Sequence, residues 1–268
     1  MNLQEWLGTE EEKPLDRLAT DGGLCGILRS IGCIGDSLSS GEFETYDDDG
    51  KKVYLDRYEY SWGQFIARAA GLKVHNFSRG GMTAKAYCDY FAEEQGFWSK
   101  DLACNAYILA LGANDCHQIA LGSVADINDA DPKKNAETFA GYYARIIAQY
   151  KEISPNAKFF LMSQPVCESY DYLKPGWGEA HAALLYDLAA HFSNCYVIDL
   201  RKYAPEYDAA FREKFFLRGH LNAAGYVLTA QMVMSYIDYI IRHNLADFHE
   251  IGLVDTPYYG KDKKEEAK

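Results

Sequence analysis

The chain lacks an excess of basic residues: its 268 residues include 27 Lys and Arg against 39 Asp and Glu, a formal net charge of −12. A negative field of this size disfavours binding to nucleic acid and to anionic membrane surfaces, so neither is an expected partner. The chain also lacks any stretch of about 18 uncharged apolar residues, so no transmembrane helix is expected. Its first residues show no basic segment followed by an apolar run, and no signal peptide is predicted.

Cysteine spacing typical of a metal site is also lacking. The seven cysteines are an odd number, they are scattered through expected strands and helices, and no pair has metal-ligand spacing. We therefore expect free thiols, a reducing cytoplasmic location and no metal. No Gly-x-Gly-x-x-Gly or P-loop follows the first expected strand, so a nucleotide-binding flavodoxin-like protein is a weaker alternative and no cofactor is expected.

What is present is a strand–helix alternation typical of one α/β domain. Strands are predicted near residues 28–34, 72–77, 105–111, 158–162 and 195–200, and helices near 60–70, 83–91, 139–150, 176–192 and 222–243. This order predicts a mainly parallel five-stranded sheet in a flavodoxin-like three-layer α/β/α sandwich.

We expect a single domain over residues 1–260, because no linker divides the chain and no segment repeats. An acidic lead-in, residues 1–26, is predicted to be helical or irregular, and a charged tail, residues 261–268, is predicted to be disordered. Residues 41–60 contain Asp-Asp-Asp-Gly-Lys at their centre, which predicts a turn between two short strands inserted just after the first strand.

The end of the first strand carries the candidate nucleophile. The apolar run Ile31–Ile34 ends in Gly35-Asp36, a tight turn, and Ser37 follows at once. Ser37 is therefore expected at the carboxyl end of a central strand, where open α/β sheets bind their ligands. Taken alone, it would more often be a turn serine or a helix cap than a nucleophile.

Three further motifs follow Gly35-Asp36-Ser37-Leu38 in a fixed order: Asn76–Thr83 with Arg79-Gly80-Gly81, Leu109–Asp115 with Gly112-Ala113-Asn114-Asp115, and Gly219–Tyr226 with His220-Leu221-Asn222. Together the four resemble the sequence blocks of the SGNH, or GDSL-type, hydrolases. The resemblance extends over roughly Leu28 to Ile241, most of the chain.

The resemblance implies a serine ester hydrolase that works through an acyl-enzyme. Ser37 would be the nucleophile and His220 its general base and then acid, since a serine hydroxyl needs an adjacent base to attack. The implied oxyanion donors are the backbone amides of Ser37 and of Gly80 or Gly81 and the side-chain amide of Asn114.

One position departs from the family pattern. The family usually carries an aspartate three residues before the histidine, and here that position is Leu217. Asp199 or Glu213 could supply the orienting acid, although Asp199 could instead only cap the next segment. The resemblance also allows a dyad, in which a backbone carbonyl or water near Leu217–Arg218 holds Nδ1–H of His220.

The substrate is less strongly indicated. Abundant tyrosine (21 residues), Trp177 and the lack of an obvious long apolar lid favour short-chain acyl esters of a sugar or aryl alcohol, with His117 and Trp177 as candidate substrate contacts. A lipid ester or thioester hydrolase, an acyltransferase with the same Ser-His site, and a catalytically silent binding protein remain alternatives. The sequence leaves the oligomeric state open.

Overall fold

The computed structural model describes residues 3–167 and 172–261 and shows the central sheet that the sequence predicts. Its strands are β1 (Ser30–Gly35), β4 (Lys73–Ser78), β5 (Ala106–Ala110), β6 (Lys158–Met162) and β7 (Cys195–Ile198). They are arranged in the order β4-β1-β5-β6-β7, and every neighbouring pair is parallel. β1, which leads to Ser37, therefore lies inside the sheet.

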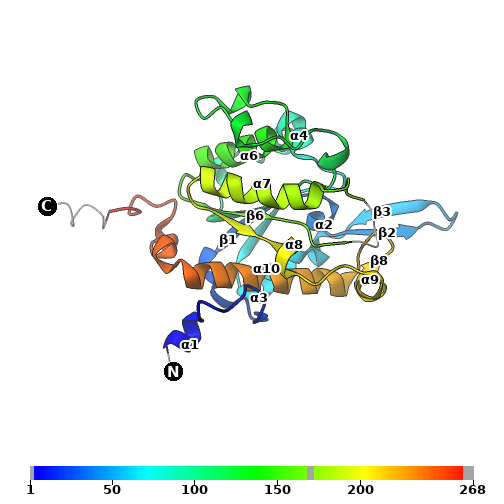
Figure 1. Cartoon of the computed structure of the whole chain (residues 1–268), viewed down its shortest axis with the longest axis horizontal. Helices are drawn as coiled ribbons and strands as arrows, with labels where there is room; N and C mark the ends of the chain where they lie inside the picture. Colours follow the sequence, from blue (N-terminus) through cyan, green and yellow to red (C-terminus); the bar gives the residue numbers. More distant parts are fainter. Residues whose placement is uncertain (1–2, 168–171, 262–268) are drawn as a thin grey trace.

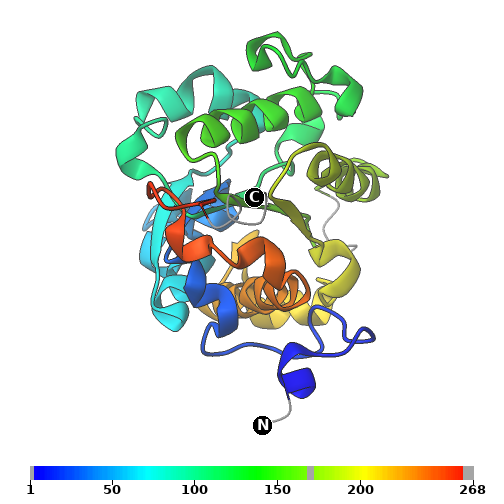
Figure 2. The same cartoon turned by 90° about the vertical axis from the view of Figure 1, so that its left-hand side faces the viewer.

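Helices cover both faces of this sheet, which confirms the three-layer α/β/α architecture (Figures 1 and 2). One face carries α6 (Phe139–Ile153), α7 (Trp177–His191) and a helical segment made of α4 (Ala84–Ala86), the π turn η3 (Tyr87–Phe91) and α5 (Ala92–Glu94). The other face carries α3 (Trp62–Ala70) and the long helix α10 (Ala223–His243).

Two hydrophobic cores result, one on each face of the sheet. In β5, Tyr107 and Leu109 point into the core beneath α6 and α7, whereas Ala106 and Ile108 point into the core beneath α3 and α10. All four are fully buried. Because both faces are covered, the strands read as continuous apolar runs in the sequence, without polar alternation.

The insertion after the nucleophile forms a β-hairpin. The short helix α2 (Ser37–Ser40) ends at Gly41 and is followed by β2 (Glu42–Tyr46), which pairs antiparallel with β3 (Lys52–Asp56). The carboxylate of Asp47 accepts hydrogen bonds from the amides of Asp49 and Lys51 and so fixes the turn. The hairpin projects from the sheet at the end where α2, β8 and α9 also lie (Figure 1).

Short elements complete the chain. The remaining α-helices and strands are α1 (Leu3–Leu7), α8 (Leu200–Tyr203), α9 (Ala209–Phe215), β8 (Phe216–Leu217) and β9 (His220–Leu221). The 3₁₀ turns are Gly23–Leu28, Tyr58–Tyr60, Lys100–Leu102, Asp115–His117, Val124–Asp126, Pro132–Lys134, Leu245–Phe248 and Ile251–Leu253. The tail predicted over residues 261–268 lies almost wholly outside the described residues.

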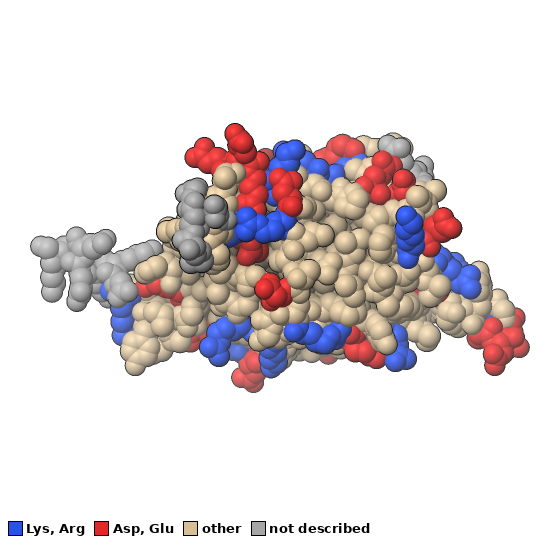
Figure 3. Space-filling view, turned by 90° about the horizontal axis from the view of Figure 1, so that it is seen from below, with Lys and Arg blue, Asp and Glu red and all other residues tan. Residues whose placement is uncertain are grey.

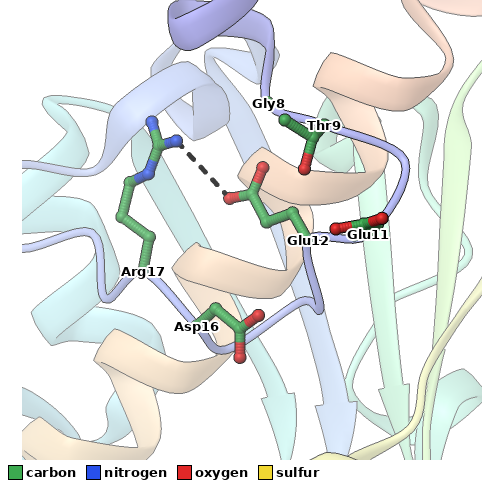
Figure 4. A pocket seen from close by; sticks show the side chains of 6 residues that line it. All are labelled: Gly8, Thr9, Glu11, Glu12, Asp16 and Arg17. Carbon is green, nitrogen blue, oxygen red and sulfur yellow. Dashed lines mark ion pairs between the residues drawn. The ribbon is translucent and has the colours of Figure 1, made fainter.

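The lead-in segment is anchored to α10 by one buried arginine. Arg242 holds the carboxylate of Glu12 with two nitrogens, at 2.7 and 2.9 Å, and donates to the carbonyl of Leu7 at 2.6 Å. A cavity of about 550 Å³ lies in the lead-in, lined by Gly8, Thr9, Glu11, Glu12, Asp16 and Arg17 (Figure 4). None of the candidate catalytic residues lines it, and Glu12, one of its lining residues, docks the segment on Arg242.

The surface gives no sign of a membrane span. In residues 3–167 and 172–261, no helix has the length and apolar character needed to cross a bilayer. Figure 3 shows acidic and basic side chains interspersed over the face that contains α10.

All seven cysteines are free thiols, as the sequence predicts, and five of them are buried.

Candidate active site

Ser37 is the first residue of α2 and follows directly from the carboxyl end of β1. The preceding Asp36 caps this helix: its carboxylate accepts a hydrogen bond from the amide of Leu38 at 3.1 Å, and its carbonyl accepts from Ser39 and Ser40 at 3.0 Å. Ser37 is half-buried. The turn therefore presents the serine at an edge of the sheet where β2, β4 and β9 all contact α2.

His220 is the first residue of β9, and its ring lies between the carboxylates of two residues on β2. Nε2 is 3.1 Å from Oε1 of Glu42, and Nδ1 is 3.4 Å from Oε2 of Glu44. Glu42 and Glu44 are two residues apart on one strand, so both side chains point to the same face of the hairpin. The ring of Tyr54, from β3, meets the imidazole edge-on with 5.7 Å between ring centroids.

The two glutamates alter the proton affinity of His220. Burial lowers the pKa of the imidazole, but hydrogen bonding and charge from Glu42 and then Glu44 outweigh burial, so the pKa is raised above its ordinary value of 6.5. The imidazolium is therefore favoured over a wider pH range than in an exposed histidine.

Glu44 is the more firmly held of the two carboxylates. It is 5% exposed, its Oε1 lies 2.6 Å from Nζ of Lys52, and its Oε2 accepts the backbone N–H of Gly219 at 3.1 Å. Burial raises the pKa of Glu44, but Lys52, His220 and the Gly219 amide more than offset burial and hold it below its ordinary value. Glu44 is therefore an anion at neutral pH.

Glu42 reaches from the histidine to the glycines expected to bind the oxyanion. A Cβ at position 80 would collide with Oε2 of Glu42, so a larger residue there would displace this carboxylate. Gly81 has φ of +71°, a left-handed conformation that glycine adopts without strain in the turn after β4. Both glycines thus lie where the sequence motif implies, and Glu42 occupies the space in front of Gly80.

Asn114 joins the nucleophile turn to the glycine segment. Its Nδ2 donates to the carbonyl of Met82 at 3.1 Å and lies 3.5 Å from Oδ2 of Asp36, while its Oδ1 accepts the hydroxyl of Tyr172 at 2.7 Å. The four sequence motifs therefore converge on one edge of the sheet. Of the two Nδ2 contacts, the one to Asp36 is the longer and weaker.

Two buried aspartates lie behind this edge. Asp115 is fully buried; its Oδ1 accepts the amide of Ala84 at 2.9 Å, and its Oδ2 has no partner among the described residues. Burial raises the pKa of Asp36 to about 6 and that of Asp115 to about 7. The nucleophile turn thus rests on carboxyl groups that are partly protonated near neutral pH.

Neither acid suggested by the sequence lies at His220. The carboxylate of Asp199 caps α8, accepting from the amide of Lys202 at 3.2 Å, and is also bonded by the hydroxyls of Ser163 and Tyr186 at 2.8 and 3.1 Å. Glu213 is exposed on α9.

The carbonyl expected near Leu217–Arg218 is engaged elsewhere. The carbonyl of Arg218 accepts from the guanidinium of Arg212 at 3.2 Å. The group at Nδ1 of His220 is instead the Glu44 carboxylate, which the sequence analysis did not single out. The only signal was two acidic residues at strand spacing directly after the nucleophile.

The two candidate substrate contacts have different positions. His117 is exposed, and its Nε2 lies 2.5 Å from the carbonyl of Tyr172, the residue that also bonds Asn114. Trp177 is only 9% exposed and packs against Phe139, with 6.2 Å between ring centroids. Trp177, a candidate substrate contact in the sequence, is the first residue of α7 and belongs to the core on that face of the sheet.

In residues 3–167 and 172–261, no group of three His, Cys, Asp or Glu side chains could hold a metal ion. A narrow cavity of about 60 Å³, lined in part by Asp36, Leu38, Ser39 and Trp62, lies behind the nucleophile turn. Ser37 is not among its lining residues, so this cavity is not the space in front of the hydroxyl.

Comparison with known proteins fits this geometry. Residues 33–228 match the family model described as the GDSL-like Lipase/Acylhydrolase family, and the chain belongs to that family. No curated protein sequence matches the chain.

Several solved structures share the fold. An acetyl xylan esterase, AlAXEase, is 19% identical, with 78% of this chain and 99% of that chain covered and a TM-score of 0.50. The esterase EstA from Pseudoalteromonas sp. is 14% identical, with 80% and 98% covered and a TM-score of 0.51. A family two carbohydrate esterase from Clostridium thermocellum, in complex with cellohexaose, is 15% identical, with 82% of this chain but only 65% of that longer chain covered and a TM-score of 0.55.

Proposed function

We propose that this protein is a serine ester hydrolase that removes short acyl groups from a sugar or aryl alcohol through an acyl-enzyme. The observation that carries the proposal is the convergence of Ser37, Gly80, Asn114 and His220 on one edge of the central sheet. Membership of the GDSL-like family supports ester hydrolysis as the chemistry.

In the proposed mechanism, Oγ of Ser37 attacks the ester carbonyl carbon while Nε2 of His220 takes the hydroxyl proton. The resulting oxyanion is stabilised by the backbone N–H of Ser37, a backbone N–H of the Gly80-Gly81 segment and the side-chain amide of Asn114. The carbon–oxygen bond to the alcohol then breaks as His220 returns the proton to the leaving oxygen. Water, deprotonated by His220, then attacks the acyl carbon; the bond between that carbon and Oγ of Ser37 breaks, His220 returns the proton to Oγ, and the acid is released.

The surface beside His220 supports a carbohydrate or aryl alcohol as the leaving group. Tyr46 and Tyr54, on the hairpin, are 46% and 52% exposed. Tyr54 contacts the His220 ring, so an aromatic surface continues outward from the site. Exposed aromatic rings offer flat apolar faces on which sugar or aryl rings can stack. Two structural neighbours are described as a carbohydrate esterase and an acetyl xylan esterase, which favours the sugar.

A panel of p-nitrophenyl esters from acetate to palmitate, assayed beside acetylated sugars, tests the proposal. We expect the highest kcat/KM for acetyl or propionyl esters, and covalent labelling of Ser37 by a fluorophosphonate. A preference for long acyl chains would instead favour a lipid ester or thioester hydrolase. Acyl transfer to added alcohol in preference to water would identify an acyltransferase, and absence of both turnover and labelling would leave a binding protein.

A further inference from the structure

We propose that Glu44 is the positioning acid of His220, supplied by the hairpin in place of the aspartate that the family usually carries three residues before the histidine. This inference rests on the proposed function, because it concerns the base that activates Ser37. The insertion after the nucleophile, residues 41–60, would then help to orient the catalytic base.

The geometry around Glu44 is that of a held carboxylate. Its Oε2 faces Nδ1 of His220 at 3.4 Å and also accepts the amide of Gly219 at 3.1 Å. Its Oε1 is 2.6 Å from the ammonium of Lys52, which pairs with Tyr46, two residues beyond Glu44 on the same strand. The Nδ1 contact is longer than an ideal hydrogen bond, as is common for catalytic contacts without a substrate.

This arrangement meets the two requirements of an orienting acid. The acid must be ionised, and Lys52 with the Gly219 amide keeps Glu44 ionised. It must also fix one tautomer: with Nδ1–H donated to Glu44, Nε2 of a neutral His220 is an acceptor that can take the Ser37 proton. A carboxylate further stabilises the imidazolium that forms when the proton is transferred.

A purely structural role is the competing explanation, since Glu44 also ties the Gly219 turn to the hairpin. The two roles differ in what they require. Structural tethering needs an acceptor for the Gly219 amide, which the carbonyl oxygen of glutamine supplies. Positioning of a histidine that becomes charged needs a negative charge, which glutamine lacks.

The test compares Glu44→Gln with Glu213→Gln, the same chemical change at an exposed position on α9. For Glu44→Gln we expect kcat on p-nitrophenyl acetate to fall by about 10²–10⁴-fold, bounded above by the loss reported when a triad aspartate is neutralised. KM should change by less than about threefold, because no substrate contact is removed. Glu213→Gln should match the wild type in both constants.

The pH profile gives a second readout. Glu42 and Glu44 on β2, Lys52 and Tyr54 on β3, Asp36 before α2 and Arg218 in the adjoining turn are the titratable or charged groups that surround His220. Removing the Glu44 charge takes away one anion that favours the imidazolium. The acidic limb of kcat/KM should therefore move to lower pH in Glu44→Gln and stay in place in Glu213→Gln.

Glu44→Asp provides the rescue variant, since it keeps the charge on a shorter side chain. We expect it to recover at least tenfold of the kcat lost in Glu44→Gln. If Glu44→Gln does not fold, Lys52→Met takes its place: it keeps the carboxylate, removes the bound cation, and should shift the acidic limb to higher pH.

The result that would overturn the inference is a Glu44→Gln enzyme with wild-type kcat per fluorophosphonate-titrated site and an unmoved acidic limb. A loss confined to the number of titratable sites would likewise assign Glu44 to structure alone. The ¹⁵N shifts of His220 report its tautomer without turnover. These shifts therefore test the Glu44–His220 contact even if the wild type hydrolyses no ester. In that case the proposed function would be wrong, and the contact would be judged by the tautomer alone.

Discussion

Oε1 of Glu42 lies 3.1 Å from Nε2 of His220, the nitrogen that the proposed mechanism requires to accept the Ser37 proton. In the absence of substrate, a protonated Nε2 therefore donates to Glu42 and is unable to act as a base. Glu42 also closes on Gly80, so a bound ester must share space with this carboxylate. Substrate binding and activation of the base are thus linked through one side chain.

Glu42→Gln should move the acidic limb of kcat/KM to lower pH. The hydrogen bond and charge of Glu42 raise the pKa of His220, so their loss lets the imidazole become neutral at lower pH. A pH series from about 4 to 9 on p-nitrophenyl acetate would measure the shift, with the exposed Glu59→Gln as the matched control. An unmoved limb would show that Glu42 does not control protonation of the base.

Ser37→Ala should reduce ester turnover to the uncatalysed background and abolish fluorophosphonate labelling, because it removes only the nucleophilic hydroxyl from the start of α2. Thermal denaturation should show an intact fold. Ser39→Ala, in the same short helix, is the control, since the Oγ of Ser39 is buried and has no partner among the described residues. Residual turnover in pure Ser37→Ala would place the nucleophile elsewhere.

Asn114→Ala should lower kcat by about 10²–10³-fold, the usual effect of deleting one oxyanion donor. Steady-state kinetics with a soluble acetyl ester would separate kcat from KM. Tyr172→Phe should have a smaller effect, because it removes only the hydroxyl that orients the amide through Oδ1. A change in KM with kcat intact would identify Asn114 as a substrate-binding group with no part in stabilising the oxyanion.

Asp115→Asn should stabilise the protein at pH 8 more than at pH 5. Burial raises the pKa of Asp115 from 3.8 to about 7, so the folded state binds the proton more tightly than the unfolded chain. The stability associated with this proton is fully present below pH 3.8 and is lost as the pH rises through about 7.

The size of this effect follows from the shift. The difference between about 7 and 3.8 is about three units, and one unit corresponds to about 1.4 kcal/mol, so the effect at pH 8 is at most about 4 kcal/mol. Urea denaturation at both pH values would measure it. Equal changes in the free energy of unfolding at pH 5 and pH 8 would contradict the buried charge as the cause.

Much of the fold was predictable from the sequence because a parallel sheet covered on both faces leaves a clear pattern. The strand predicted near 158–162 coincides with β6, and the helix predicted near 176–192 differs from α7 by one residue at each end. The hairpin after the nucleophile was also predicted, but β8 and β9 were not: they have two residues each, too short for any periodicity.

The candidate site was likewise predictable only in part. Ser37, Gly80 and Asn114 each lie within four residues of the end of a central strand, so their motifs indicate their positions. The partner of His220 could not be predicted, because Glu44 is 176 residues away in the sequence and meets the histidine only through the packing of β2 on β9. For Trp177 the sequence suggested a substrate contact because the residue is aromatic, but the packing of α7 places it in the core.

The hairpin also has a consequence for the order in which the site is assembled during synthesis. Ser37, Glu42, Glu44 and Lys52 belong to one continuous stretch of the chain, but β1 pairs with β4 and β5, which are made later. His220 is made later still and joins the hairpin through a two-residue strand, just before the long helix α10. A chain that has not yet docked β9 therefore lacks its base, and hydrolytic competence arises only when the C-terminal segment closes onto the hairpin.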